Sequence, residues 1–312
     1  MPNHILVTGG AGFIGSNLVD YINSHSPTTR VTVLDDLSTG LESNLAESRC
    51  TVILDTILNY AALLKASQGV DSIVHLAAIG SVPRSITAPR PTHDANSLGT
   101  LNVLEAAREN DVKHVVVASS SSVYGNNPSM PKNEMDWTRP LSPYAASKLA
   151  TESYALAYGF SYGMKTLAMR FFNVYGPRQR ADHDYAAVIP KFIDAALSGK
   201  SLVVHGDGNQ SRDFTHVDSV CAALLDSCVR EVHHNQPINL AFGSNTTLLK
   251  LIDVLENHLG RELVVKHEDP REGDVRASQA DPTLLGDFFP TLRPVELNLG
   301  VKQTLEWFLQ GD

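Results

Sequence analysis

The chain has 312 residues, of which 43% are hydrophobic and 19% charged, and its formal net charge is −9. This composition is typical of a globular protein with one large domain or two modest ones. The acidic balance, without any basic run, excludes nucleic acid as an expected partner. No apolar stretch approaches the ~18 residues of a transmembrane helix, and no leader-like segment precedes residue 4, so we expect a cytoplasmic protein without membrane contact.

Cysteine and histidine usage indicates neither a disulfide framework nor a metal centre. The three cysteines, Cys50, Cys221 and Cys228, are odd in number and lack the spacing of a zinc site. The histidine pair at 233–234 has no carboxylate or cysteine at ligand spacing. We therefore expect reduced thiols and no bound metal.

Strand and helix patterns alternate along the first half of the chain. Short, apolar, β-branched runs predict strands covered on both faces at residues 5–8, 31–34, 52–54, 73–76, 115–118 and 166–171. Amphipathic stretches predict helices at residues 16–24, 100–110 and 145–158, and a further helix pattern follows at 189–197. This alternation predicts an α/β fold with a doubly wound parallel sheet, the Rossmann architecture.

The pattern changes after Asn173, where a mixed α/β remainder begins. We predict a Rossmann domain at residues 1–173 and a smaller C-terminal α/β substrate-binding domain at residues 174–312. Residues 214–242 are expected to return to the first domain, because residues 239–242 have the pattern of another buried strand. A substrate cleft between two close-packed lobes is the natural consequence.

A glycine-rich segment at residues 9–15 follows the first strand directly and opens the first helix. Glycines there allow a tight turn and a close approach of the backbone to a pyrophosphate at the helix N-terminus. Asp35 lies twenty residues beyond Gly15, at the end of the second strand, where its carboxylate can bind the adenosine ribose hydroxyls. Because Asp35 and Asp36 would repel the 2′-phosphate of NADP, we predict that this domain binds NAD.

Tyr144 and Lys148 stand four residues apart on one helical face, behind Pro143. This is the spacing at which an ammonium can lower the pKa of a phenol, and a phenolate near neutral pH is a competent base. The serine run at 119–122 ends the strand at 115–118, at the carboxyl edge of the sheet where ligands of this fold bind. A hydroxyl there can share the proton of an alcohol substrate with Tyr144, so the pattern predicts oxidation of an alcohol.

Six motifs together resemble those of the extended short-chain dehydrogenases/reductases. They are GGAGFIG at 9–15, DDL at 35–37, HLAA at 75–78, SSSSVYG at 119–125, YAASK at 144–148, and GDG at 206–208 with RD at 212–213. Within that superfamily the chain most closely resembles the UDP-sugar 4-epimerases, through RFFNVYGP at 170–177 and REGDVR at 271–276. The resemblance covers nearly the whole chain and implies NAD as cofactor and a UDP-sugar as substrate.

The resemblance also implies roles for individual residues. The implied catalytic residues are Ser120, Tyr144 as the base, and Lys148, which would orient the nicotinamide ribose. The implied cofactor contacts are Gly9, Gly12, Phe13, Ile14, Gly15, Asp35, Asp36, Thr56, Leu76, Ala77, Ala78, Asn96, Tyr144, Lys148 and Phe171. The implied substrate contacts are Gly80, Ser81, Ser120, Asn173, Gln179, Ala187, Val188, Val203, His205, Arg212, Arg271, Asp274 and Ser278. Arg212 and Arg271 would hold the diphosphate through their guanidinium forks. At Thr56 the family usually has an aspartate that contacts adenine, whereas here Asp55 stands one residue early.

The residues after Ser120 decide between reaction types. Related 4,6-dehydratases carry an Asp-Glu pair there and decarboxylases carry a Glu, whereas this chain has Ser121 and Ser122. An elimination would lack its second acid/base carboxylates, while epimerisation needs only the oxidising residues. In the implied mechanism, Tyr144 and Ser120 take the proton of the sugar's O4 while the C4 hydride passes to NAD⁺. The 4-keto sugar then turns over, and the hydride returns to its other face.

Four features resemble the UDP-N-acetylglucosamine 4-epimerases in particular. They are GSVPRS at 80–85, GPRQ at 176–179, YAAVIP at 185–190, and a small residue, Ser278, after DVRx. A small Ser278 leaves volume for a 2-acetamido group, and Asn173 and Gln179 offer amide partners to the sugar. UDP-glucose and UDP-galactose also fit such a pocket. Residues 180–184 replace the Asp-Pro-Asn-Gly stretch common in the family, which leaves a strict N-acetyl preference open.

Two alternative functions remain. One is a UDP-glucuronate 4-epimerase, or another NDP-sugar oxidoreductase or dehydratase, for which Arg84 and Arg180 are candidate cations. The other is a non-catalytic NAD-sensing protein on the same fold, in which loss of Tyr144 or Lys148 would be expected. Both residues are present in this chain.

The resemblance also implies a homodimer. The helices at 100–110 and 145–158 correspond to those that pair between subunits in the family, and their leucines are candidate apolar contacts. These leucines are Leu101, Leu104, Leu149 and Leu156. Their alternative role is packing within the monomer.

Overall fold

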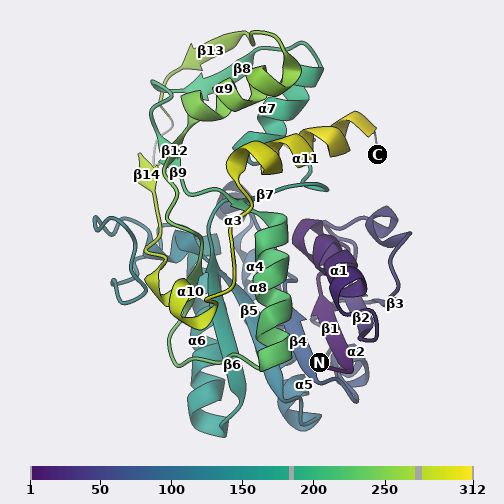
Figure 1. Ribbon diagram of the computed structural model, residues 1–312. Helices are drawn as coiled ribbons and strands as arrows, with labels where there is room; N and C mark the ends of the chain where they lie inside the picture. Colours follow the sequence, from purple (N-terminus) through teal and green to yellow (C-terminus); the bar gives the residue numbers. More distant parts are fainter. Residues whose placement is uncertain (1, 183–185, 271–275, 311–312) are drawn as a thin grey trace.

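The centre of the protein is a seven-stranded β-sheet (Figure 1). The computed structural model describes residues 2–182, 186–270 and 276–310. The strands are ordered β11-β6-β5-β4-β1-β2-β3, and all neighbouring pairs are parallel. Their bounds are β1 His4–Thr8, β2 Arg30–Asp35, β3 Thr51–Leu54, β4 Ser72–His75, β5 His114–Ser120, β6 Lys165–Phe171 and β11 Ile238–Leu240. This order confirms the predicted Rossmann-type doubly wound sheet.

The predicted strands all lie in this sheet, but one is less covered than its pattern indicates. β1, β4 and β5 are almost entirely buried, as expected for strands between two helical layers. In β3, however, Val52 is 41% exposed and Leu54 is 65% exposed. The prediction that residues 52–54 are covered on both faces is wrong, because β3 is the last strand at one edge of the sheet.

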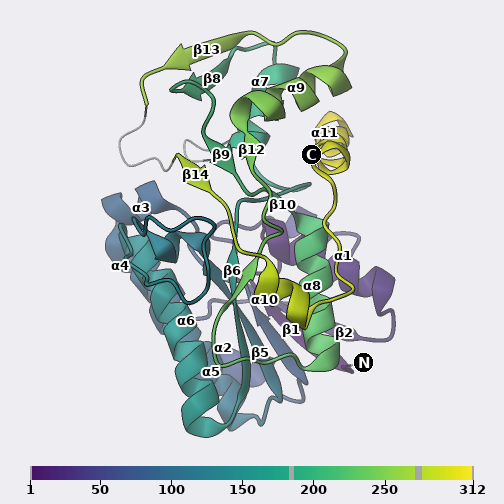
Figure 2. The same ribbon diagram turned by 60° about the vertical axis from the view of Figure 1, so that its left-hand side comes forward.

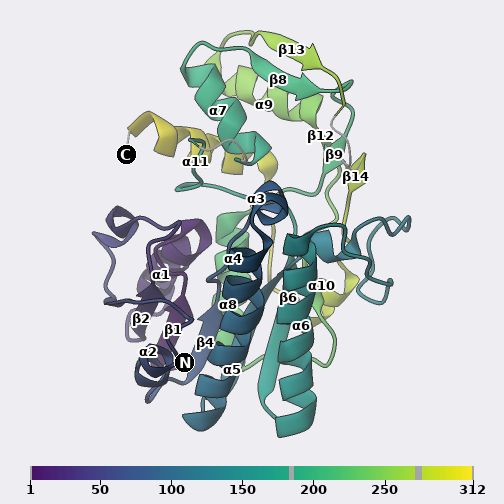
Figure 3. The same ribbon diagram turned by 180° about the vertical axis from the view of Figure 1, so that it is seen from behind.

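Helices cover both faces of the sheet. α1 (Phe13–His25) and α8 (Val217–Arg230) lie on the face turned forward in Figure 1. α2 (Tyr60–Ala66), α5 (Gly99–Glu109) and α6 (Pro143–Tyr162) lie on the opposite side, and α5 and α6 come forward in Figure 3. The helix from 145 to 158 that the sequence predicts is thus the middle of a longer helix, α6.

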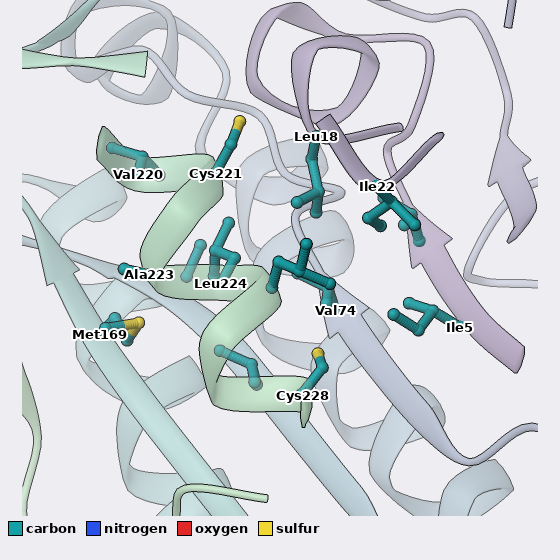
Figure 4. Close-up of a cluster of buried hydrophobic side chains, with 14 of the residues drawn as sticks. Ile5, Leu18, Ile22, Val74, Met169, Val220, Cys221, Ala223, Leu224 and Cys228 are labelled. Atoms are coloured by element: carbon teal, nitrogen blue, oxygen red, sulfur yellow. The ribbon is translucent and has the colours of Figure 1, made fainter. Parts of the chain in front are cut away.

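Each face of the sheet has its own hydrophobic core. Under α1 and α8, Leu18, Ile22 and Leu224 pack against Ile5 and Val74 of the sheet (Figure 4). The second core includes Leu104 of α5, which is fully buried within the chain. Leu104 is therefore not available as a contact between subunits, because the monomer's own core covers it.

The chain returns to the sheet after its first six strands. β11 pairs with β6 through Ile238 and Met169, and α8 packs against α1. Both elements lie within the segment at 214–242. A later helix, α10 (Thr283–Phe288), also adds Leu285 to the first core. The division of the chain into domains at residue 173 stays a prediction.

The C-terminal elements form a layer above the sheet in the view of Figure 2. They are α7 Val188–Leu197, β8 Leu202–His205, α9 Leu248–Leu259, β13 Val265–Glu268 and α11 Leu297–Gln310. β8 and β13 pair in parallel, and α7, α9 and α11 share a separate core that includes Ile193, Leu251 and Val301. The elements of the upper layer therefore pack around a hydrophobic core that is separate from the two cores of the sheet.

Short elements complete the chain between these layers. They are η1 Glu42–Leu45, α3 Val82–Thr87, α4 Pro89–His93, the π-helical η2 Asp94–Leu98, η3 Ser121–Tyr124, β7 Val174–Tyr175, β9 Ser211–Arg212, β10 Thr215–His216, β12 Thr246–Thr247 and β14 Ala277–Ser278. β7 pairs with β10, and β9 lies between β12 and β14. In the described part of the chain, no helix combines the length and apolarity needed to cross a bilayer.

Candidate active site

The glycine-rich turn at 9–15 joins β1 to α1. Gly9 has a φ of 72°, in the left-handed region that favours glycine, and a Cβ on it would lie 2.6 Å from the backbone nitrogen of Ala77. A side chain on Gly15 would likewise overlap the backbone of Gly9. α1 begins at Phe13 with Gly12 as its N-cap, so no capping side chain covers its first N–H groups. The turn therefore fits an anionic diphosphate at a helix N-terminus.

Asp35 ends β2 beside this turn. Its two carboxylate oxygens accept hydrogen bonds from the backbone N–H groups of Ala11 and Leu37, each at 2.9 Å. Burial raises the pKa of Asp35, and these two hydrogen bonds act in the opposite direction. The next carboxylate, Asp36, accepts from the N–H of Ser38 at 2.9 Å. The structure thus brings the predicted ribose-binding carboxylates next to the glycine turn.

Other predicted cofactor residues follow the carboxyl ends of the central strands. Leu76, Ala77 and Ala78 come directly after β4, and the N–H of Leu76 donates to the carbonyl of Thr8 at 3.1 Å. Phe171 is the last residue of β6 and is buried. Because parallel strands end at one edge, these residues share that edge with the glycine turn.

Two other predicted cofactor residues, Thr56 and Asn96, form hydrogen bonds within the protein. The N–H of Thr56 donates to the carboxylate of Asp55 at 2.8 Å. The side-chain oxygen of Asn96 accepts from the N–H of Ile79 at 2.8 Å, and its amide nitrogen donates to Ser147 Oγ at 2.9 Å. Asn96 thus anchors two segments of the site, and contact of Thr56 or Asn96 with the cofactor stays a prediction.

The three predicted catalytic residues converge at the carboxyl end of β5. Ser120 is the last residue of β5, and its side chain is hydrogen-bonded to that of Tyr144 in the first turn of α6. Lys148 lies one turn further along α6, where its ammonium donates to the carbonyl of Ala118 at 2.9 Å. The hydroxyl of Ser122 also donates to Ser120 Oγ, at 2.9 Å.

Burial governs the ionisation of this group. It raises the pKa of the Tyr144 phenol, which the hydrogen bond with Ser120 lowers in part. It also lowers the pKa of Lys148 to about 8. The sequence leads us to expect that Lys148 lowers the pKa of Tyr144, but the ammonium is directed at Ala118 and burial disfavours the phenolate. The four-residue spacing alone therefore does not produce a phenolate.

A cavity of about 760 Å³ opens beside α7, β8 and β9. Its volume lies within the roughly 300–1,000 Å³ of small-molecule sites. Six predicted substrate contacts line it: Asn173, Ala187, Val188, Val203, His205 and Arg212. The lining residues that were not predicted from the sequence include Lys191, Gln210, Phe214 and Glu268. Gln210 and Phe214 flank the Arg212-Asp213 motif in the sequence, so their position could have indicated that they line the same site.

Ser278 is connected to this cavity by strand pairing, because its strand pairs with the strand that carries the lining residue Arg212. It belongs to β14 and pairs in register with Arg212 of β9. The neighbouring Asp213 is buried and accepts hydrogen bonds from Gly243 and Ala280 N–H and from Ser244, at 2.7 to 3.1 Å. This carboxylate therefore joins the strand of Arg212 to that of Ser278, a role that sequence reasoning missed.

Comparison with known proteins identifies the family. A profile of the NAD dependent epimerase/dehydratase family matches residues 5–241. The chain belongs to this family. Its relatives include the UDP-glucose 4-epimerase of Mycolicibacterium smegmatis, which is 36% identical over 97% of each chain. These findings confirm the resemblance drawn from the sequence motifs.

Solved structures of other family members superpose on nearly the whole chain. UDP-N-acetylglucosamine 4-epimerase from Methanobrevibacter ruminantium M1, in complex with UDP-N-acetylmuramic acid, has a TM-score of 0.93 and 38% identity over 99% of both chains. UDP-glucuronic acid 4-epimerase from Bacillus cereus, in complex with UDP-glucuronic acid and NAD, has a TM-score of 0.88 and 29% identity. That match covers 98% of this chain and 99% of the other.

NAD is the cofactor of this epimerase/dehydratase family member. The described residues fit it, because the turn at Gly9 and Gly15 leaves no room for side chains where the backbone must approach a diphosphate. The carboxylates of Asp35 and Asp36 stand at the end of β2, the position from which the adenosine ribose of a dinucleotide is bound.

The remaining predicted substrate residues that the structure describes do not line the cavity beside α7. Ser81 caps α3 by accepting from the N–H of Arg84 at 3.2 Å, directly after Gly80. The Gln179 side chain donates from Nε2 to the carbonyl of Val174 at 3.0 Å, and its Oε1 is buried with no partner among the described residues. The side-chain atom of Gln179 without a partner is therefore an acceptor oxygen. Two predicted residues, Arg271 and Asp274, lie outside the described residues.

Two serines that hold Tyr144 were also missed. Ser147 lies inside the YAASK motif, three residues after Tyr144, so the motif itself could have indicated this contact. Ser85 comes from α3, 59 residues before Tyr144, and no local pattern marks a contact over that separation. Within the described ranges, no three His, Cys, Asp or Glu side chains gather as a metal site would require.

Proposed function

We propose that this enzyme inverts the configuration at C4 of a UDP-hexose, with UDP-N-acetylglucosamine and UDP-N-acetylgalactosamine as its preferred pair. The observation that carries the proposal is the hydrogen-bonded Ser120 and Tyr144 beside Lys148, with serines at 121 and 122 where an elimination would need carboxylates. Such a site can remove and return the proton of one hydroxyl.

Each of the three residues has a distinct task. The Tyr144 side-chain oxygen takes the proton of the sugar's O4 as the phenolate and later returns it as the phenol, and Ser120 is hydrogen-bonded to that side chain. The buried Lys148 ammonium, one turn away, favours negative charge on the phenol oxygen once substrate excludes water. When bound, NAD⁺ accepts the C4 hydride and NADH gives it back.

The cavity beside α7 accommodates the UDP part of the substrate. Arg212 lines it and supplies the guanidinium for the diphosphate, while Val203 and His205 of β8 form a wall suited to the uracil ring. Asp213 fixes the backbone on which Arg212 stands. A firm hold on the diphosphate, with the sugar free to rotate about its bonds to that group, lets both faces of C4 reach one Tyr144.

The preference for an acetamido sugar rests on Ser278 and Gln179. Ser278 is small and pairs with Arg212, so a 2-acetamido group finds volume beside the diphosphate site. The Oε1 of Gln179 has no partner among the described residues but is buried, so it can accept a hydrogen bond from an acetamido N–H once the side chain turns toward the sugar. The similarity to the Methanobrevibacter ruminantium UDP-N-acetylglucosamine 4-epimerase supports the same choice. UDP-glucose, which lacks that group, remains a slower substrate in this proposal.

The uronate alternative has less support. Arg180, a candidate partner for a C6 carboxylate, forms a two-pronged ion pair with Asp182 at 2.9 and 2.6 Å. Both side chains of this pair are exposed, so the pair competes with a substrate carboxylate for Arg180 only weakly. The alternative of a non-catalytic NAD sensor is disfavoured because Ser120, Tyr144 and Lys148 are assembled at one strand end.

The test is direct conversion of three candidate substrates. The purified protein is incubated with UDP-GlcNAc, UDP-Glc or UDP-GlcA, with and without added NAD, and the C4 epimers are separated by chromatography. We expect UDP-GalNAc from UDP-GlcNAc, with a higher kcat/KM than for UDP-Glc and no product from UDP-GlcA. Faster conversion of UDP-GlcA than of the neutral sugars would replace this proposal with the uronate alternative, and no epimer from any sugar would refute C4 epimerisation.

A further inference from the structure

The first turn of α6 carries Tyr144, and such a turn leaves backbone N–H groups without partners inside the helix. The N-cap residue Ser142 accepts one of them, from Ala145 at 3.1 Å. The N–H of Tyr144 instead donates to Ser85 Oγ at 3.0 Å, a hydroxyl that comes from a different helix, α3. The catalytic tyrosine is thus capped by a tertiary contact.

Ser85 makes this contact in a fixed orientation. Its side chain is fully buried, and its hydroxyl donates to the carbonyl of Val82 at 2.6 Å while it accepts from Tyr144. One hydroxyl therefore joins α3 to α6 with both its donor and its acceptor function in use. α3 follows directly on Gly80 and Ser81, which belong to the proposed sugar-binding segment.

A second route joins the same segment to the other side of Tyr144. The carbonyl of Tyr144 accepts from Ser147 Oγ at 2.8 Å, and Ser147 Oγ in turn accepts from Asn96 Nδ2 at 2.9 Å. Asn96 also bonds both backbone groups of Ile79, at 2.8 and 3.2 Å. Residues 79–85 are therefore tied to the N–H and to the carbonyl of Tyr144.

We infer that Ser85 is a positioning residue for the base Tyr144, which it couples to the segment at 79–85 that receives the sugar. The inference rests on the proposed function. The phenol must keep its hydrogen bond with Ser120 and also reach the substrate hydroxyl, and a misplacement of about 1 Å can cost on the order of 100-fold in rate. Ser85 fixes the backbone from which that phenol projects. Sugar binding next to α3 thereby acts on the alignment of the base.

Four variants separate positioning from simple stabilisation of the fold. Ser85→Ala removes the hydroxyl, Ser85→Cys removes it at nearly constant volume, and Ser85→Thr retains it. Thr87→Ala is the matched control, because Thr87 is an exposed residue of the same helix whose hydroxyl donates to the carbonyl of Pro83, within α3, at 3.3 Å.

Turnover is measured with the favoured UDP-sugar and with the same sugar deuterated at C4, together with bound NAD and the pH dependence of kcat. For Ser85→Ala and Ser85→Cys we expect kcat to fall about 10- to 100-fold. KM and NAD content should stay within about twofold, and the isotope effect should rise as the chemical step becomes limiting. Ser85→Thr should recover most of kcat, and Thr87→Ala should match the wild type.

Two results would overturn the inference. One is unchanged kcat and isotope effect in both Ser85→Ala and Ser85→Cys. The other is a loss of kcat that parallels loss of bound NAD or of folded protein, which would make Ser85 a purely structural cap. If the wild-type enzyme forms no C4 epimer, the proposed function itself fails. In that case hydrogen exchange at the Tyr144 amide, which needs no turnover, still tests the contact: equal exchange in wild type and Ser85→Ala refutes it.

Discussion

Two properties of Tyr144 together define its chemistry: the desolvation of its phenol raises the pKa of that group, and its only described side-chain hydrogen bond is with Ser120. Removing the phenol oxygen should therefore abolish proton transfer without disturbing the fold. For Tyr144→Phe we expect kcat to fall by roughly 10²- to 10⁴-fold, with bound NAD retained. The measurement is UDP-GalNAc formation from UDP-GlcNAc alongside cofactor content.

The matched control for this change is Tyr154→Phe. Tyr154 lies on the same helix, but its side chain is partly exposed, and it is not part of the site. Its variant should keep full activity. Near-normal turnover in Tyr144→Phe would mean that another group serves as the base.

Residue size at position 278 should set the choice of sugar. Ser278 pairs with Arg212, so a bulky side chain there would occupy space beside the diphosphate site. For Ser278→Tyr we expect kcat/KM for UDP-GlcNAc to fall at least about tenfold relative to that for UDP-Glc, because steric exclusion acts on the 2-acetamido group. Ser278→Ala, which stays small, should leave the ratio near the wild-type value. An unchanged ratio in Ser278→Tyr would remove Ser278 from the account of specificity.

At the scale of elements, Asp213 holds β9 against β14 and the chain around Gly243. Its carboxylate accepts four hydrogen bonds in a fully buried position. Asp213→Asn turns one of its acceptor oxygens into a donor that faces other donors, so we expect about 1–3 kcal/mol less stability. KM for the UDP-sugar should also rise, because Arg212 loses its fixed backbone. Thermal unfolding and initial rates measure the two effects.

The control for that variant is Asp207→Asn, six residues earlier in the GDG motif at 206–208. Asp207 is exposed and accepts from the N–H of Asn209 at 2.9 Å. Its variant should change neither the stability nor KM appreciably. If Asp213→Asn behaves in the same way, the carboxylate does not organise the substrate side of the molecule.

The elements of the sheet were predictable because their signals are local. An apolar run such as residues 115–118 fixes a strand through its own side chains, and the observed β5 extends it by only one residue before and two after. The burial of β3 was not predictable, because an edge position depends on strand order. The two-residue strands such as β9 carry too few side chains to leave a pattern.

The same distinction explains which parts of the site were predictable. Ser120, Tyr144 and Lys148 belong to motifs whose spacing already places them together. The contact of Ser85 with Tyr144 and the bonds of Asp213 join segments 59 and 30 or more residues apart. These contacts exist only once the helices and strands have packed, so no local sequence pattern encodes them.

For the molecule as a whole, two buried histidines set an acid limit on stability. Burial lowers the pKa of His75 to about 3 and that of His114 to about 4, from 6.5. Between pH 6.5 and these values the unfolded chain binds protons that the folded chain does not, so stability falls as pH decreases. We expect a loss on the order of several kcal/mol between pH 7 and pH 4.

Urea denaturation at a series of pH values measures this limit. His75→Gln should make the decline shallower, because it removes a group that protonates only on unfolding, although it also removes hydrogen bonds with Thr8 and Thr100. The test is therefore the slope of stability against pH and not its absolute value. A slope that is the same in the variant and the wild type would show that other groups cause the acid limit.

The outer surface of α5 and α6 predicts the assembly of the molecule. Leu104 is used by the monomer's core, but Leu98, the last residue of η2 directly before α5, is 44% exposed, and Tyr154 of α6 is 38% exposed. Exposed apolar side chains at the start of α5 and on α6 suit a symmetric contact with a second copy. We expect light scattering after size exclusion to give twice the mass of the 33.8 kDa chain.

The double variant Leu98→Glu/Tyr154→Glu should give the monomer mass, because each charge would be buried without a partner in the pair. Trp137→Glu is the control: Trp137 is 51% exposed, but it lies in the loop before α6 and not on the helices themselves. A dimer that persists in the double variant would place the contact on another face. A wild-type species of 33.8 kDa would mean that the catalytic site, which draws Ser120, Tyr144 and Lys148 from one chain, works without a second copy.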